Sequence, residues 1–175
     1  MNGSDQTLYV LQGEFRVSRD PATILSTILG SCVAVCLWDA GVGVGGMNHF
    51  LLPFGPKAAD MAPERYGVHA MEVLINGLLK QGARRNRLQA KLFGGARLSA
   101  TLSDIGAANA GFARDFLATE DIVCVAESLG GNAARRVLFR PTTGHVRQLL
   151  VPPTEVEPPI ALHGRLPSAA AIELF

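Results

Sequence analysis

The chain has 175 residues, of which 48% are hydrophobic and 18% charged, a composition typical of one globular domain with a sizeable core. This composition excludes a disordered or fibrous protein, and a formal net charge of +1 gives no concentrated basic face of the kind that binds nucleic acid. The three cysteines form no C-x-x-C pair and are odd in number. They do not form the disulfide framework of a small secreted protein, so we expect a reducing, cytoplasmic environment.

An uncharged apolar stretch from Ala22 to Trp38 raises the question of a membrane span. Hydroxyl-bearing residues and a glycine interrupt it, and its β-branched residues favour two buried strands over a membrane helix. The first residues, MNGSDQTLYV, lack the basic start and apolar run of a signal peptide. The sequence therefore predicts neither membrane insertion nor export.

The first third of the chain is predicted to form strands, which we place at residues 13–17, 22–29, 33–37 and from Val44 up to Pro53. The third of these is a near-continuous apolar run, which is typical of a strand buried on both faces. A turn at residues 39–43 makes the third and fourth strands hairpin neighbours. In the fourth strand, Gly45 and Gly46 permit another part of the backbone to approach closely.

A loop from Phe54 to Pro63 is predicted to border a site, and a helix follows it. Apolar residues recur at helical spacing from Val68 to Leu78, and Gly82 is placed to end the helix. A strand at 88–93 comes next, and then a second helix from a possible N-cap at Ser103. The remaining strands are expected at residues 122–126, 137–139 and 146–151, and the last two form a hairpin.

Strands outnumber helices in this order and include hairpins, so an α+β fold with the helices on one side is favoured over a doubly wound parallel sheet. After Val151 the sequence PPTEVEPP blocks both helix formation and strand pairing. We therefore predict one domain at residues 1–151, with its core ending near Leu150, and a Pro-rich tail at residues 152–175.

Cys32 is the candidate nucleophile among the three cysteines. A cysteine attacks carbonyl carbon as a thiolate and needs a nearby base or positive field. Cys36 and Cys124 lie inside apolar runs and are typical of small core residues, whereas Cys32 follows Gly30 and Ser31 at a turn. Unpaired backbone N–H groups at such a turn can bind an oxyanion. On the residues alone, an ordinary buried strand cysteine is the favoured interpretation of this position.

His49 is the candidate base because it lies on the strand predicted beside Cys32. His69 and His145 are placed in a helix and a hairpin turn, and His163 lies in the tail, where histidines are more often surface residues. A metal site of Cys32, Cys36 and His49 would lack any recognised ligand spacing. No metal ion is therefore expected.

Four segments, taken together, resemble the family of chemoreceptor glutamine deamidases called CheD. They are TILGSCVAVCLWD at residues 27–39, GGMNHFLLP at 45–53, KLFGGA at 91–96 and GGNAARRVLF at 130–139. They occur in the family's order across residues 8–151. The resemblance implies a layered α/β/β sandwich of mixed or antiparallel sheets, of the cysteine-hydrolase type.

The resemblance also implies the catalytic residues. The cysteine of the family's G-S-C-V motif is Cys32 here, and the histidine of its next motif is His49. The family adds a hydroxyl-bearing residue shortly before the cysteine, for which Ser26 and Thr27 compete. Strict strand alternation would place Ser26 on the face of Cys32, so we expect Ser26, although a bulge at Gly30 would favour Thr27.

The implied activity is hydrolysis of glutamine side-chain amides in methyl-accepting chemotaxis receptors to glutamate, through a thioester on the cysteine. The resemblance implies no cofactor. It also implies some activity on glutamate methyl esters. Some family members also bind the phosphatase CheC, which makes CheC a possible partner. Two alternatives stay open: a chemotaxis regulator that binds receptors or CheC with little turnover, and a thiol hydrolase of another amide or ester.

Overall fold

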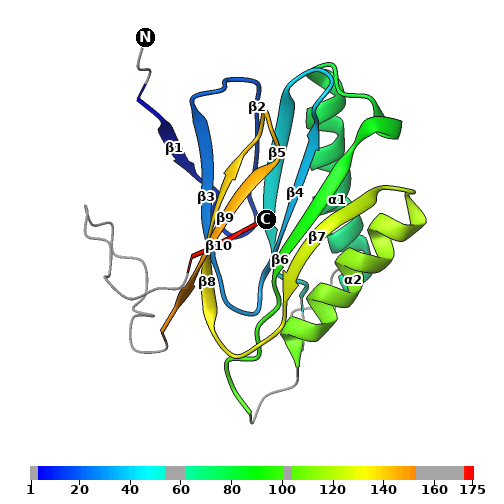
Figure 1. The fold of residues 1–175 in the computed structure, drawn as a ribbon. Coiled ribbons are helices and arrows are strands. Elements are labelled where there is room, and N and C mark those ends of the chain that lie inside the picture. Colours follow the sequence, from blue (N-terminus) through cyan, green and yellow to red (C-terminus); the bar gives the residue numbers. More distant parts are fainter. Residues whose placement is uncertain (1–3, 54–61, 101–103, 153–171) are drawn as a thin grey trace.

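Two mixed β-sheets lie face to face, and two helices cover the outer face of one of them (Figure 1). The computed structural model describes residues 4–53, 62–100, 104–152 and 172–175, and all counts refer to these residues. The first sheet has the strand order β1 (Gln6–Tyr9), β3 (Thr23–Leu29), β8 (Ala134–Arg140), β9 (His145–Val151) and β10 (Ile172–Leu174). The second has the order β2 (Phe15–Ser18), β5 (Val44–Phe50), β4 (Val33–Asp39), β6 (Gln89–Gly94) and β7 (Val123–Leu129). We call them sheet A and sheet B.

The helices α1 (Pro63–Lys80) and α2 (Ile105–Thr119) pack on sheet B only, and a short 3-10 helix lies at Arg85–Arg87. The predicted α+β class and the α/β/β layering are thereby confirmed. Within the part of the chain that the structure describes, no helix is both long and apolar enough to cross a membrane. The apolar stretch from Ala22 to Trp38 forms β3 and β4 instead.

Strand β4 is the centre of the molecule and is buried along its whole length. Its alternating side chains serve two cores: Val33, Val35 and Leu37 join the cluster under the helices, and Ala34, Cys36 and Trp38 join the cluster between the sheets. This double burial is the reason for the unbroken apolar run in the sequence. The predicted hairpin with β5 is confirmed, because β4 and β5 pair antiparallel.

Two short strands were missed by the sequence analysis because their residues show no apolar alternation. Strand β1 pairs parallel to β3, and three of its four residues are exposed. Strand β10 pairs antiparallel to β9, and the ring of Phe175 packs against the core between the sheets. The last residues of the chain thus return to sheet A, although the composition indicated only a tail. The division at residue 151 stays a prediction.

Candidate active site

The candidate nucleophile lies where the chain passes from sheet A to sheet B. Residues 30–32 connect β3 to β4, at the lower end of the molecule in Figure 1. Three hydrogen bonds hold this turn. Gly95 N–H donates to the carbonyl of Cys32 at 2.8 Å, and Ala96 N–H donates to that of Gly30 at 2.9 Å. The buried side chain of Asn109 on α2 donates to the carbonyl of Ser31 at 2.8 Å.

Gly94 allows the close approach that these bonds need. A Cβ at this position would lie 2.1 Å from the carbonyl oxygen of Cys32, and the φ angle of +110° favours glycine. The glycine pair at residues 94 and 95 therefore lets the loop after β6 lie against the backbone of Cys32. Cys32 itself is partly buried and packs against the core between the sheets.

His49 faces the same space between the sheets. In the β4–β5 pairing His49 lies opposite Ala34, and Ala34 belongs to the inter-sheet core. Cys32, in the turn just before β4, packs against the same inter-sheet core. The imidazole is buried, and its Nε2 has no hydrogen-bond partner in the part of the chain that the structure describes. A buried nitrogen without a partner is unusual and is a candidate for proton transfer.

The other ring nitrogen of His49 is held by Thr27. The distance from His49 Nδ1 to Thr27 Oγ1 is 2.8 Å, and the Thr27 hydroxyl donates its proton to the carbonyl of Val10 at 2.7 Å. Because that proton is already used, Oγ1 accepts from Nδ1–H. The same carbonyl lies 3.3 Å from Nδ1, which also requires a proton on Nδ1. The network therefore leaves the lone pair of the neutral imidazole on Nε2.

Ser26 does not take part in this network, contrary to the orientation that strand alternation suggested. Leu25, Thr27 and Leu29 alternate toward sheet B, so Ser26 points to the opposite face of sheet A, as does the half-exposed Ile28. Its Oγ is buried and has no partner among the described residues. The expectation failed because Cys32 belongs to another sheet, and alternation counted along β3 does not continue through the turn at Gly30.

Burial keeps the pair of candidate residues neutral at rest. Burial raises the pKa of the Cys32 thiol to about 11, against a smaller lowering by the N–H of Cys32 itself. Burial lowers the pKa of His49 below its usual value, against a smaller rise from the Val10 carbonyl. A thiol and an unprotonated imidazole are therefore the resting forms at neutral pH.

Gln12 is a site residue that the sequence analysis did not find. The Cys32 thiol donates to its side-chain oxygen Oε1, with a sulfur–oxygen distance of 3.5 Å. Gln12 lies in the exposed turn between β1 and β2, and the adjacent Gly13 N–H donates to the carbonyl of His49 at 2.8 Å. No local motif marked this residue, because only the tertiary structure brings the turn to Cys32.

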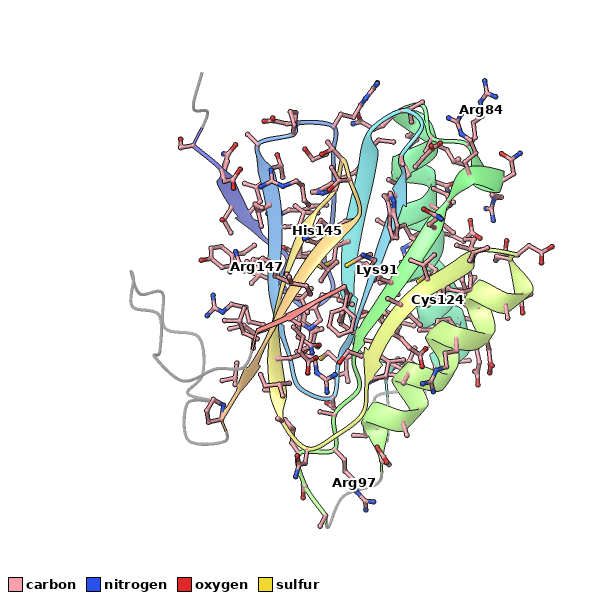
Figure 2. The ribbon with its side chains drawn as sticks, viewed as in Figure 1. Arg84, Lys91, Arg97, Cys124, His145 and Arg147 are labelled. Carbon is pink, nitrogen blue, oxygen red and sulfur yellow. The ribbon has the colours of Figure 1, made fainter. Side chains whose placement is uncertain are left out.

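The remaining cysteines and histidines lie elsewhere. Cys36 is buried in the core as expected, whereas Cys124 is exposed on the edge strand β7 and is not a core residue (Figure 2). His69 and His145 are exposed, and His145 lies far from the lower end of the molecule, where Arg97 marks the loop bound to the Cys32 turn (Figure 2). His163 lies outside the described residues. Among those that are described, no group of three metal-ligating side chains occurs.

The stretch of Gly45 and Gly46 does not line an open surface. A Cβ on Gly45 would lie 2.2 Å from the carbonyl oxygen of Pro141, and one on Gly46 would lie 2.7 Å from that of Arg16. The close backbone approach expected from these glycines is confirmed, but it is packing between strands. Most of the loop predicted to border the site, together with the possible N-cap Ser103, lies outside the described residues. The observed N-cap of α2 is Asp104.

Comparison with known proteins points to one family. A family model described as CheD chemotactic sensory transduction matches residues 51–149. A Rhizobium meliloti protein named probable chemoreceptor glutamine deamidase CheD is 50% identical, over 96% of this chain and 95% of the relative. A Caulobacter protein of the same name is 51% identical, over 96% and 92%. Among solved structures, Neisseria meningitidis protein NMB0706 overlaps 73% of this chain and 64% of its own, at 12% identity and a TM-score of 0.47.

Proposed function

Because the chain belongs to the CheD family, we propose that it deamidates glutamine side chains of chemoreceptors with Cys32 as nucleophile, His49 as base and Thr27 as the residue that orients the base. The observation that carries this assignment is the hydrogen bond between Thr27 Oγ1 and His49 Nδ1, which leaves a basic Nε2 without a partner among the described residues. The same bond replaces Ser26 with Thr27 as the third residue of the proposal.

The reaction begins with a neutral thiol and a neutral imidazole. A receptor glutamine binds with its amide carbon next to Cys32 Sγ, and the thiol leaves its contact with Gln12 to give its proton to His49 Nε2. The sulfur attacks the amide carbon, and the carbonyl oxygen becomes an oxyanion. The N–H of Cys32, which already interacts with its own sulfur, is the proposed donor to this oxygen.

The tetrahedral intermediate then loses ammonia. His49 returns its proton to the amide nitrogen, the carbon–nitrogen bond breaks, and a glutamyl thioester remains on Cys32. Water loses a proton to His49 Nε2 and attacks the thioester, and the sulfur leaves and is reprotonated. The overall change is one amide and one water converted to one carboxylic acid and one ammonia. Neither a metal ion nor an organic cofactor takes part in these steps.

The test is Cys32-dependent conversion of a receptor. A purified receptor cytoplasmic domain is incubated with wild type, Cys32→Ala or Cys124→Ala, and glutamine-to-glutamate conversion is mapped by peptide mass spectrometry. Cys124 is an exposed cysteine on β7, so its substitution is the matched control. We expect conversion by wild type and Cys124→Ala and none by Cys32→Ala. Equal conversion by all three, or by none, would contradict the proposal.

A CheC-type phosphatase is the second partner that we propose, on the basis of the family resemblance. If chemoreceptor glutamines are the substrate, the enzyme works in the cytoplasm, where those glutamines are accessible. Binding is tested with Cys32→Ala, which retains the surface of the enzyme but cannot turn over. Binding of purified CheC that competes with the receptor domain would support a shared surface. Binding of the receptor or of CheC, with no receptor conversion by wild type, would favour the alternative of a regulator. Cys32-dependent hydrolysis of another amide or ester, with no receptor conversion, would favour the alternative of a different substrate.

A further inference from the structure

We propose that Gln12 makes the enzyme prefer an amide over a methyl ester, because its Oε1 accepts a hydrogen bond from the amide nitrogen that departs as ammonia. This inference rests on the proposed function and adds a specificity-determining residue to it. The relevant contact is the 3.5 Å distance from Cys32 Sγ to Gln12 Oε1. It shows a hydrogen-bond acceptor directed at the nucleophile, from a side chain exposed to the arriving substrate.

The turn that carries Gln12 is fixed to the proposed base. Gly13 N–H donates to the carbonyl of His49, and His49 N–H donates to the carbonyl of Glu14, at 2.8 and 3.1 Å. Within the turn, Glu14 N–H donates to the carbonyl of Leu11 at 2.9 Å, and Leu11 N–H donates to the Glu14 carboxylate at 3.1 Å. These hydrogen bonds therefore fix the position of the backbone at Gln12 relative to His49.

The chemistry of the attacked group decides what Gln12 contacts. Once the thiol proton has moved to His49, Oε1 loses its donor and is free to accept another hydrogen bond. The nitrogen of an amide attacked by Sγ lies next to the sulfur on the same carbon and carries two N–H donors. A methyl ester has an oxygen without hydrogen at that place, which would face Oε1 as a second acceptor. The ester therefore gains no hydrogen bond from Oε1, whereas the departing amide nitrogen does, and the amide reacts faster.

The side chain of Gln12 contributes little to the stability of the fold. Its side chain is exposed, and the Cys32 thiol is the only hydrogen-bond partner of that side chain among the residues that the structure describes. Substitution here is therefore expected to change the free energy of unfolding by less than about 0.5 kcal/mol. An effect on one substrate and not on the other is then an effect on recognition.

The test compares two substrates. A receptor domain carrying glutamine at the modified position is measured against the same domain carrying glutamate methyl ester there. Gln12→Met removes the acceptor at similar side-chain length, Gln12→Glu retains it, and Gln6→Met makes the same change at an exposed glutamine on β1. We expect Gln12→Met to lower kcat/KM for the amide by roughly 5- to 10-fold relative to the ester, which is the effect of one neutral hydrogen bond.

Gln12→Glu should lower the rates for both substrates, since its charge opposes thiolate formation, but should keep the wild-type preference for the amide. Gln6→Met should change neither rate. An equal fall for both substrates in Gln12→Met, or no fall, would overturn the inference. If the ester rate is too small to measure, the inference requires slower amide conversion by Gln12→Met with no slower alkylation of Cys32 by iodoacetate. Absence of Cys32-dependent turnover by wild type would refute the proposed function instead.

Discussion

The polar groups at the two ends of strand β4 (Val33–Asp39) differ in their hydrogen bonding. Asp39 ends the strand, and its fully buried carboxylate accepts from the N–H groups of Gly41 and Arg84, both at 2.9 Å, and from the guanidinium of Arg87 at 3.0 and 3.1 Å. Just before the start of the strand, the Cys32 thiol has one long contact to Gln12, and on the neighbouring strand His49 Nε2 has no partner, in both cases among the residues that the structure describes.

This difference separates a structural group from the proposed reactive pair. Burial raises the pKa of Asp39, but the donors of Arg84, Arg87 and Gly41 outweigh burial and hold its pKa below the usual value. Burial acts on Cys32 and His49 without comparable compensation, so both stay neutral. A satisfied polar cluster stabilises the fold, whereas an unsatisfied one keeps its hydrogen-bonding capacity for a substrate.

The largest expected effect is the loss of activity in His49→Gln. Without Nε2 the thiol of Cys32 has no base, so we expect receptor conversion to fall by about 10³-fold or more. The substitution also removes the buried bond from Nδ1 to Thr27, so the free energy of unfolding should fall by about 1 kcal/mol, which is less than in Asp39→Ala. Receptor mass spectrometry and denaturant unfolding measure the two quantities. Destabilisation as large as that of Asp39→Ala would remove the contrast between the two ends of the strand.

Asp39→Ala should show the opposite pattern. The N–H groups of Gly41 and Arg84 and the Arg87 guanidinium lose their acceptor, so we expect unfolding to become easier by about 2–4 kcal/mol. Conversion per folded molecule should stay within about twofold of wild type, because the residue lies at the far end of β4 from Cys32. Urea unfolding and receptor assays below the transition measure this. A stable but inactive variant would refute the structural role of Asp39.

Thr27→Val should reduce conversion by roughly 10- to 100-fold, because the imidazole loses the acceptor that fixes its protonation state and orientation. Thr27→Ser retains the hydroxyl and should keep most of the activity. Ser26→Ala is the matched control on the other face of β3 and should stay within about twofold of wild type. The same receptor assay decides between the two residues, and a larger loss in Ser26→Ala than in Thr27→Val would restore Ser26.

The last expected effect concerns the pH dependence of the Cys32 thiol and not the loss of a side chain. The pKa of Cys32 is raised to about 11, so its thiolate fraction should rise about tenfold for each pH unit between pH 7 and 10. The rate of Cys32 alkylation by iodoacetate, followed by peptide mapping to separate it from Cys124, should rise with the same slope. His49→Gln should retain that slope, since the imidazole is already neutral. A plateau at pH 6–8 in wild type would instead indicate a resting thiolate–imidazolium pair.

Several features of the site followed from local sequence signals. The unbroken apolar run at residues 33–37 predicted a doubly buried strand, and the turn at 39–43 predicted its hairpin with the strand of His49. Those signals sufficed because strand periodicity and turn composition are local properties. Cys124 was wrongly predicted to be a core residue. Its apolar neighbours in the sequence lie on an edge strand, whose outer residues remain open to solvent.

The sequence by itself determined the layered α+β fold, the family, and the strands that carry Cys32 and His49, since hydrophobic patterning and ordered motifs are written along the chain. Only the tertiary structure showed that Thr27, and not Ser26, bonds to His49 and that Gln12 lies against the thiol. The physical reason is the same in both cases. Which face Thr27 occupies relative to Cys32 depends on how the chain crosses from sheet A to sheet B. The position of Gln12 depends on pairing between segments that are distant in the sequence. Neither can be inferred from neighbouring residues alone.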